Sequence, residues 1–286
     1  MPLKDKHVVV TGSDGFVGRY LVEQLKDRGA KVTPFDIAEG SDITRWSDFS
    51  RITKADIVFH LAARTFVPTS QKNPRLTYEI NLMGTANVLE MCRVTGARMI
   101  FASSYVYGNP QYLPTDEKHP VNPTNTYARS KVLGEQLCHA YHEDHDVPCV
   151  ILRPFNIFGP GQDESFLIPE IIKQLKVGDV LTLQDLKPRR DLLYVSDAVD
   201  AYVKAGEYDA SNYEIFNIGY GESFSVEDVA KKLIKLTGND VELRSLRIER
   251  QGAINDTVAD TRKAKEQLKW QPAVDLVAGL ESTLNA

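Results

Sequence analysis

Apolar runs and amphipathic stretches alternate through the first half of the chain, and this alternation restricts the fold more than any other feature. We expect the apolar runs to be strands, at 7–10, 31–35, 56–61, 98–102 and 148–153. Patterns typical of helices lie between them, including a long one at 73–94 and another at 125–143. Strands that alternate with helices predict an α/β fold, a doubly wound parallel sheet with helices on both faces.

A glycine-rich turn follows the first run. Thr11-Gly12-Ser13-Asp14-Gly15-Phe16-Val17-Gly18 spaces its glycines as G-x-x-G-x-x-G in front of a helical pattern. Such a turn lets main-chain N–H groups approach a pyrophosphate at a helix N-terminus. The second run ends at Asp36, whose carboxylate suits an adenosine ribose diol and repels a 2′-phosphate. We therefore predict a Rossmann dinucleotide site that prefers NAD to NADP, a preference that only Arg19 or Lys31 could reverse.

A tyrosine and a lysine, Tyr127 and Lys131, stand four positions apart in the 125–143 pattern. On a helix they project from the same face. The ammonium and a bound oxidised nicotinamide are expected to lower the phenol pKa from about 10, which would create a proton acceptor near neutral pH. From the spacing alone, a packed ring beside a solvated lysine is an equally open alternative.

Composition excludes several classes of protein. The 286 residues, 42% apolar, can bury a large core, and no run approaches the roughly 18 apolar residues of a membrane span or forms a signal peptide. A net charge of −5 with both signs interspersed gives no reason to expect a nucleic acid partner. Cys92, Cys138 and Cys149 are widely spaced and lie near no His or Cys cluster, so we expect buried thiols, a cytoplasmic location and no metal site.

The alternation weakens after residue 161. We expect a dinucleotide-binding domain at 1–160 and a mainly substrate-binding lobe at 161–286, interleaved with the end of the main sheet and closing over a substrate. Prolines between 109 and 126 exclude regular structure there and suggest a rim over the site. The later expected helices are 166–176, 197–205, 226–236, 261–268 and 276–284, and the later strands 180–183, 191–195, 213–218 and 241–246.

Four motifs occur together in one order: the glycine turn, Ser103-Ser104-Tyr105-Val106-Tyr107-Gly108, Tyr127 to Lys131, and Arg153-Pro154-Phe155-Asn156-Ile157-Phe158-Gly159-Pro160. With them the chain resembles the extended short-chain dehydrogenases/reductases, specifically the NAD-dependent epimerase/dehydratase family that acts on nucleotide sugars. The resemblance runs nearly end to end and includes Arg190-Asp191-Leu192-Leu193-Tyr194-Val195-Ser196-Asp197.

The resemblance implies roles for individual residues. Tyr127 takes the place of the catalytic base, Lys131 of its ribose-binding partner, and Ser103 of the hydroxyl that bonds the substrate oxygen. Asn81 would hold the active-site helix through a water or backbone contact. The expected substrate-binding residues are Ser104, Asn156, Arg190, with Arg189 as a competitor, and Arg250, although Arg250-Gln251-Gly252-Ala253 departs from the family's Arg-Pro-Gly-Asp. The expected cofactor-binding residues are Gly12, Asp14, Gly15, Phe16, Val17, Gly18, Asp36, Ile37, Asp42, Ile43, Leu61, Ala62, Ala63, Asn81, Tyr127, Lys131 and Pro154.

The same comparison separates possible reactions. Family dehydratases carry Asp-Glu where Ser104 and Tyr105 stand, and decarboxylases usually carry Glu at the place of Tyr105, so both reactions are disfavoured. We expect an NAD-dependent 4-epimerase similar to UDP-glucose 4-epimerase, in which Tyr127 deprotonates the C4 hydroxyl and a 4-keto sugar forms.

Two alternatives remain. A 4-ketoreductase is suggested because the segment 155–162, followed by 183–191, resembles GDP-4-keto-6-deoxymannose reductases. A non-catalytic NAD-binding regulator is disfavoured by the intact Ser103, Tyr127 and Lys131. The resemblance also implies a homodimer formed through 73–94 and 125–143, and it leaves the nucleotide and the sugar open.

Overall fold

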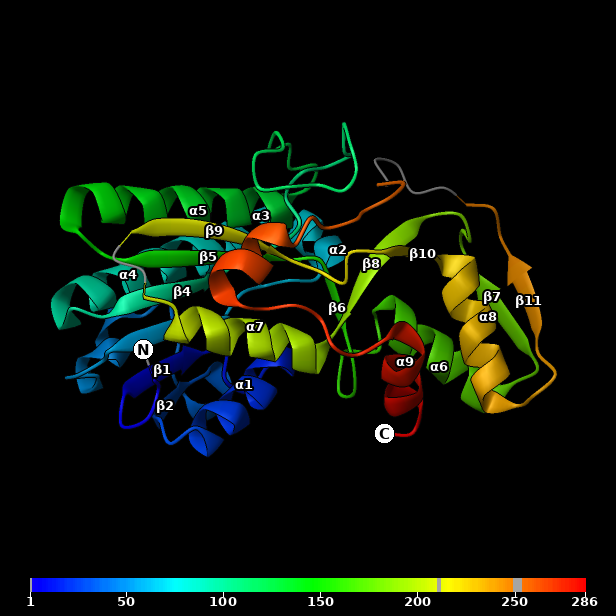
Figure 1. The fold of residues 1–286 in the computed structure, drawn as a ribbon, viewed down its shortest axis with the longest axis horizontal. Helices are drawn as coiled ribbons and strands as arrows, with labels where there is room; N and C mark the ends of the chain where they lie inside the picture. Colours follow the sequence, from blue (N-terminus) through cyan, green and yellow to red (C-terminus); the bar gives the residue numbers. More distant parts are fainter. Residues whose placement is uncertain (1, 210–211, 249–253) are drawn as a thin grey trace.

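A six-stranded parallel sheet forms the main layer of the computed structural model, which describes residues 2–209, 212–248 and 254–286 (Figure 1). The strand order is β2-β1-β3-β4-β5-β9. The direction of winding reverses between β1 and β3, and ligands of doubly wound sheets bind at the carboxyl ends of the strands at such a point. The strands are β1 (His7–Thr11), β2 (Lys31–Phe35), β3 (Ile57–His60), β4 (Arg98–Ala102), β5 (Cys149–Pro154) and β9 (Tyr213–Ile218).

Helices cover both faces of this sheet, which confirms the predicted doubly wound architecture (Figure 1). α1 (Phe16–Asp27) and α7 (Val195–Glu207) pack on one face, and α4 (Gly84–Thr95) and α5 (Thr126–His145) pack on the other. Successive strand residues serve opposite cores: Val8 and Val10 join the first, and Val9 joins the second. Strands that are apolar on both faces are typical of a parallel sheet buried between helices.

The long helix expected at 73–94 is present, and it contains a π-helical turn that the sequence does not predict. Asn73 separates it from α2 (Val67–Lys72), and its parts α3 (Pro74–Tyr78), the π turn η3 (Glu79–Met83) and α4 follow one another without a break. Pro74 starts α3 because its missing N–H is tolerated only in a first helical turn. The π turn carries the buried Asn81, and such turns are frequent at functional sites.

A second group of elements packs beside the main sheet, at the right in Figure 1. Ser225 and Asp228 form the capping box at the start of the helix Val226–Thr237. The two three-residue strands β6 and β10 are not predicted from the sequence. The group contains β6 (Asn156–Phe158), β8 (Arg189–Tyr194) and β10 (Ser223–Ser225) in one sheet, β7 (Val180–Leu183) and β11 (Glu242–Ser245) in another, and α6 (Leu167–Val177), α8 (Val226–Thr237) and α9 (Leu276–Leu284).

Some elements after residue 161 belong to the main layer instead: β9 pairs with β5, and α7 and the π turn η4 (Ala264–Leu268) pack on the first core. Short 3₁₀ turns, η1 (Ile37–Glu39) and η2 (Trp46–Arg51), follow β2. The segment 109–126 contains no regular element before α5, as predicted, and only Thr115 forms a bridge, with Ala259.

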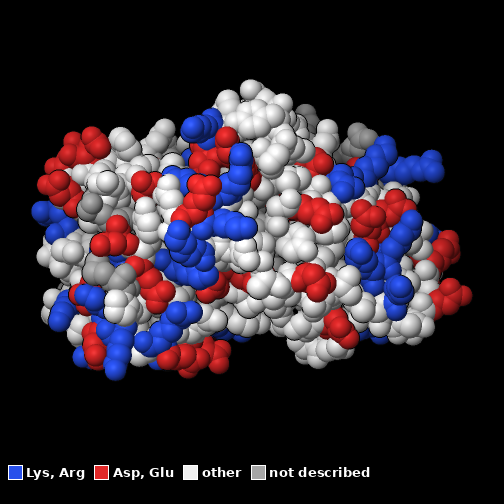
Figure 2. Space-filling model, in the orientation of Figure 1, with Lys and Arg blue, Asp and Glu red and all other residues white. Residues whose placement is uncertain are grey.

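Surface and thiols complete the description. Among the described residues, no helix has the length and apolar content needed to cross a membrane. Cys92, Cys138 and Cys149 are buried free thiols, as expected. On the face shown in Figure 2, basic and acidic side chains are interspersed.

Candidate active site

The glycine turn closes tightly against the end of β3. Gly12 has φ of 73°, and a Cβ there would lie 2.7 Å from the main-chain nitrogen of Ala62. A Cβ on Gly18 would lie 2.0 Å from the carbonyl oxygen of Gly12. Gly15 is the N-cap of α1 and offers no side chain to cap it. Side chains are thus excluded where a pyrophosphate would approach the start of α1, so these residues fit a dinucleotide.

Asp36 lies beside this turn. Its carboxylate accepts hydrogen bonds from the main-chain N–H groups of Asp14 (3.1 Å) and Ala38 (3.0 Å). Ile37 is 75% exposed, whereas Ile43 is buried against Gly84. The carboxylate is therefore fixed at the end of β2, where it would meet the adenosine ribose.

The other expected cofactor residues occupy the same edge of the sheet or the elements next to it. Asp42 follows η1 and accepts hydrogen bonds from Thr44. Leu61, Ala62 and Ala63 follow β3 and are half-buried, and Pro154 ends β5. Phe16 and Val17 form the half-buried first turn of α1.

Tyr127 and Lys131 come together on the first turns of α5, which Asn125 caps by accepting the N–H of Ala128 (2.9 Å). The Lys131 ammonium lies 5.9 Å from the centroid of the Tyr127 ring. It donates to the carbonyl oxygen of Ala102 at the end of β4 (2.7 Å). The lysine is buried rather than solvated, which excludes the alternative that the spacing had left open.

The protonation behaviour differs from the prediction in the protein without a nicotinamide. Burial raises the pKa of Tyr127, and a hydrogen bond with Ser104 only opposes that rise. Burial also lowers the pKa of Lys131 to about 8. The expected fall in the phenol pKa is therefore absent here, because removal from water outweighs the hydrogen bond with Ser104.

The side chains of the adjacent serines Ser103 and Ser104 have different hydrogen-bond partners. The Ser103 hydroxyl is buried and donates to Oε1 of Glu135 (2.5 Å). Ser104 is half-buried, and its side chain forms the hydrogen bond with Tyr127. The role expected for Ser103 thus conflicts with its position: its proton is committed to a carboxylate, and Ser104 stands at the phenol.

Asn81 holds the active-site helix, through direct bonds. Its amide donates to Oγ of Ser130 on α5 (2.8 Å) and to the carbonyl oxygen of Arg64 (3.1 Å), and its Oδ1 accepts the N–H of Arg64 (2.7 Å). Asn81 therefore ties α5 to the loop after β3, and its cofactor-binding role stays a prediction.

His60 is a buried residue of this region that the sequence reading missed. Thr85 donates to the carbonyl oxygen of Asn81, so its Oγ1 accepts from Nε2 of His60 (2.9 Å). Nδ1 then accepts from Thr11 (2.7 Å). Burial and the charge of Lys131 lower the pKa of His60 to about 3, which keeps the ring neutral. Only the fold brings these positions together, so no local motif could reveal them.

A buried ion pair is the second missed feature. Arg153 donates to both carboxylate oxygens of Glu135, from Nε (2.8 Å) and from a terminal nitrogen (2.5 Å). Although burial opposes it, Glu135 holds the pKa of Arg153 above its ordinary value. The spacing of Tyr127, Lys131 and Glu135, four residues apart each time, was the available signal.

The expected substrate residues lie on neighbouring strands of the smaller sheet. Asn156 on β6 donates to the carbonyl oxygen of Asp191 (3.0 Å), and Arg190 on β8 donates to the carbonyl oxygen of Ile254 (2.8 Å). Arg189 instead contacts Ser223 and Asp256. Arg250 lies outside the described residues.

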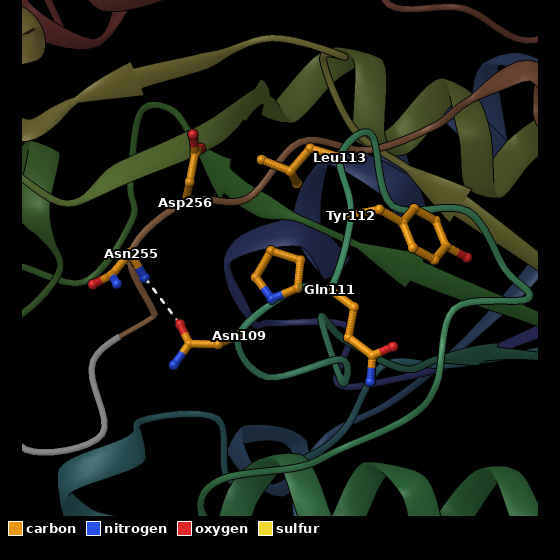
Figure 3. Close-up of a pocket in the computed structure, with 7 residues that line it drawn as sticks. Asn109, Gln111, Tyr112, Leu113, Asn255 and Asp256 are labelled. Carbon is orange, nitrogen blue, oxygen red and sulfur yellow. Dashed lines mark hydrogen bonds between the residues drawn. The ribbon is translucent and has the colours of Figure 1, made fainter.

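A hollow of about 400 Å³ opens between the 109–126 segment and the 254–260 segment (Figure 3). The main-chain N–H of Asn255 donates to Oδ1 of Asn109 across it (3.2 Å). The lining residues are Asn109, Pro110, Gln111, Tyr112, Leu113, Asn255 and Asp256.

Tyr105 stands where an acidic residue would be needed for dehydration or decarboxylation. Its hydroxyl donates to the carbonyl oxygen of Gly108 (2.7 Å), and its ring packs edge-on against Tyr107 and Phe155. Burial raises its pKa, which further removes it from acid–base work.

Comparison with known proteins decides the family. The model of the NAD dependent epimerase/dehydratase family matches residues 8–219. The chain belongs to this family. It is therefore an enzyme of the extended short-chain dehydrogenase/reductase type, and NAD is its cofactor.

Individual relatives carry different activities. The chain is 32% identical to a UDP-glucose 4-epimerase of Mycolicibacterium smegmatis, over 96% of both chains. It is 30% identical to UDP-glucuronic acid decarboxylase 1 of Xenopus tropicalis, over 98% of this chain and 72% of that one. A UDP-glucose 4-epimerase of Thermotoga maritima, solved with UDP-glucose, superposes with a TM-score of 0.92 at 28% identity and covers 98% of this chain and 97% of its own. These comparisons show the family of the chain, but the relatives within it catalyse different reactions.

Proposed function

We propose that the protein is an NAD-dependent nucleotide-sugar 4-epimerase similar to UDP-glucose 4-epimerase. The observation that carries the proposal is the arrangement at the end of β4: Tyr127, Lys131 and Ser104 meet there, and no carboxylate occupies positions 104 or 105. A lone phenol suits an oxidation that is later reversed at the same carbon, whereas dehydration needs a further acid and base.

The residues divide the work as follows. Ionised Tyr127 takes the proton from the C4 hydroxyl, and the Ser104 hydroxyl bonds the same oxygen. Lys131, held at Ala102, favours the ionised phenol electrostatically. Gly12, Gly15, Gly18 and Asp36 would hold NAD, which would supply the acceptor of the C4 hydride and the return of that hydride to the opposite face. Tyr127 then gives its proton back to the oxygen, so the enzyme ends in its starting state.

The substrate diphosphate is assigned to the smaller sheet. Asn156 supplies an amide donor and Arg190 a guanidinium fork, which suit phosphate oxygens. Arg250 remains a further candidate from the family motif. We keep the division into a cofactor part, 1–160, and a mainly substrate-binding part, 161–286, as a proposal, with Asn156 before the boundary and β9 and α7 of the main layer after it.

A 4-ketoreductase remains the second candidate, because the 183–191 segment resembles such enzymes and the same phenol would protonate a C4 carbonyl. The two reactions differ in cofactor use. An epimerase regenerates NAD in every cycle, whereas a reductase consumes NAD(P)H.

The deciding experiment incubates the purified protein with UDP-, GDP-, dTDP- and CDP-sugars without added cofactor. Conversion to the C4 epimer, absent in Tyr127→Phe, supports the proposal. Strict dependence on added NAD(P)H and a 4-keto substrate would establish the reductase. Bound NAD without turnover of any sugar, in either direction, would instead favour the non-catalytic regulator.

We also infer a homodimer that forms through 73–94 and 125–143, that is, through α3, η3, α4 and α5, which pack together. Leu76 (40% exposed), Met83 (56%) and Leu133 (36%) place apolar side chains on their outer surface. Light scattering should give twice the mass of the chain, and Leu133→Glu should reduce it to one. The cytoplasmic location stays a prediction based on the three free thiols.

A further inference from the structure

The buried ion pair between Glu135 and Arg153 lies at the centre of a hydrogen-bonded chain. This chain joins the end of β4 with Ser103 and Ser104, called the catalytic strand below, to the 109–126 loop that lines the hollow. We propose that this chain positions both sides of the site: Glu135 fixes the strand that carries Ser104, and Arg153, through Tyr107 and Asn217, fixes the 109–126 loop. The inference rests on the proposed function for its kinetic test, and it adds positioning residues to it.

The Glu135 side begins on one face of α5. Tyr127, Lys131 and Glu135 occupy successive turns of that face. Lys131 bonds the carbonyl oxygen of Ala102, and Glu135 accepts the hydroxyl of Ser103, so two consecutive residues of the strand are tied to the helix that carries the base. The Ser103 N–H also donates to Leu152 of β5 (2.8 Å). With its predecessor held at two points, Ser104 has little freedom except to face Tyr127.

The Arg153 side leads away from the catalytic strand. Its second terminal nitrogen donates to the hydroxyl of Tyr107 (2.9 Å), which in turn donates to Oδ1 of Asn217 (2.6 Å). The Asn217 amide donates to the carbonyl oxygen of Thr115 (2.9 Å), and its main-chain N–H donates to Glu117 (2.8 Å). Thr115 and Glu117 belong to the loop that lines the hollow of Figure 3, so the loop is fixed from below.

From Arg153 to Thr115, each residue of the hydrogen-bonded chain donates to the next one. Arg153 can only donate, so the Tyr107 oxygen accepts and its proton must point to Asn217. Asn217 then presents its oxygen to Tyr107 and its amide to Thr115. Ser103, Glu135, Arg153, Tyr107 and Asn217 are all 5% exposed or less, so water cannot replace a lost partner.

The two sides predict different kinetic defects. Ser103→Ala frees the catalytic strand and should lower kcat about tenfold with KM changed less than about twofold, because misplacement acts on the reacting groups. Tyr107→Phe removes one oxygen and should raise KM about fivefold with kcat nearly unchanged, because it loosens the substrate rim. Ser103→Thr, which keeps the hydroxyl, should restore most of kcat.

Tyr213→Phe is the matched control. The Tyr213 hydroxyl donates to the main-chain oxygen of Glu135 (3.3 Å), and among the described residues no hydrogen bond joins it to the Glu135 carboxylate or to Arg153. This change should leave kcat and KM within about twofold of the wild-type values.

Two further readouts do not require turnover. The titration of the Tyr127 phenol is followed by absorbance in the NAD-bound protein, and the signal of Tyr127→Phe is subtracted. In Ser103→Ala the midpoint of this titration should move to higher pH by about 0.7, because the hydrogen bond from Ser104 to the phenol is weakened. Tryptic cleavage after the exposed Lys118 should be about fivefold faster in Tyr107→Phe than in Tyr213→Phe, because the loop opens more often.

The outcomes separate the two proposals. If the wild-type protein converts no nucleotide sugar while the titration and the cleavage rate still change, the epimerase proposal fails and the positioning chain stands. If Ser103→Ala keeps the wild-type titration midpoint and kcat, the role proposed for Glu135 is overturned. If Tyr107→Phe keeps the wild-type cleavage rate and KM, the role proposed for Arg153 is overturned.

Discussion

The buried lysine of the active site should reduce the stability of the folded protein, and Lys131→Met tests this directly. Lys131 is 3% exposed, and burial lowers its pKa from 10.5 to about 8. Methionine has a similar length and no charge, so the substitution removes the buried cation without leaving a large cavity.

The expected magnitude follows from the pKa. A difference of 2.5 between the unfolded value of 10.5 and the folded value of about 8 corresponds to about 3 kcal/mol in favour of the neutral form. Methionine gives up the bond to the Ala102 carbonyl, worth about 1 kcal/mol. It also gives up the contact of the ammonium with the Phe101 ring, at 5.0 Å from the centroid. Lys131→Met should therefore raise the free energy of unfolding at pH 7 by about 1 kcal/mol or slightly more.

The sign of the pH dependence is fixed. Below pH 8 the lysine is charged in both states and the full destabilisation is present. Between pH 8 and 10.5 the folded protein binds fewer protons than the unfolded chain, so wild-type stability rises with pH. The advantage of Lys131→Met should thus shrink by about 3 kcal/mol over this range, and the difference should change sign about one pH unit above 8.

Urea denaturation at several pH values, on protein stripped of dinucleotide, measures this advantage. Lys231→Met is the control, because Lys231 is 66% exposed and pairs only with Glu227 at the surface. A difference between wild-type and Lys131→Met that stays constant from pH 7 to 10.5 would refute the reasoning, since it would mean that Lys131 carries no burial penalty. Turnover should be lost in Lys131→Met whatever its stability.

Three further predictions concern charged residues of the described structure. Asp36→Ala should raise the ratio of NADP to NAD affinity about tenfold or more, measured by fluorescence titration, because the carboxylate no longer repels a 2′-phosphate. Arg153→Met leaves the Glu135 carboxylate buried without its cation and should lower the free energy of unfolding by about 3–5 kcal/mol, while the double variant with Glu135→Leu should recover part of this loss in thermal melts. Burial raises the pKa of Asp191 from 3.8 to about 6, so the folded protein holds this proton more tightly, and wild-type stability relative to Asp191→Asn should fall by about 3 kcal/mol as pH rises from 4 to 6.

The sequence predicts the main sheet well because both faces of its strands are buried. The central strands β1, β3, β4 and β5 are therefore mainly apolar runs, whereas the edge strand β2 is exposed at Lys31 and Thr33. It predicts the Tyr127 and Lys131 pair for a similar reason, since helix periodicity is local. The π turn at Asn81 cannot be predicted in this way, because one extra residue in a helical pattern changes no local preference. We attribute the turn to the hydrogen bonds of Asn81 with Arg64 and Ser130.

The assignment of the two serines shows where local reasoning ends. Ser103 and Ser104 are chemically identical and adjacent, so their order in a motif cannot decide which hydroxyl faces the phenol. Glu135 decides it, from a helix 32 positions further along the chain. His60 and its threonine partners are unpredictable for the same reason, because their bonds connect three separate elements of the sheet and its helices.

One helix face therefore carries three opposing demands. Tyr127 must lose a proton in a buried place, where burial alone raises its pKa, and Lys131 must keep one where burial lowers it. Neither group is stable there by itself, and each charged form favours the other. Glu135 lies one turn further along the helix and is paired with Arg153. It can therefore accept the hydrogen bond from Ser103 without competing with Tyr127 as a proton acceptor. If this separation is correct, removing the charge of Arg153 should disturb the titration of Tyr127 even though the guanidinium does not touch the phenol, because the strand between them would no longer be held.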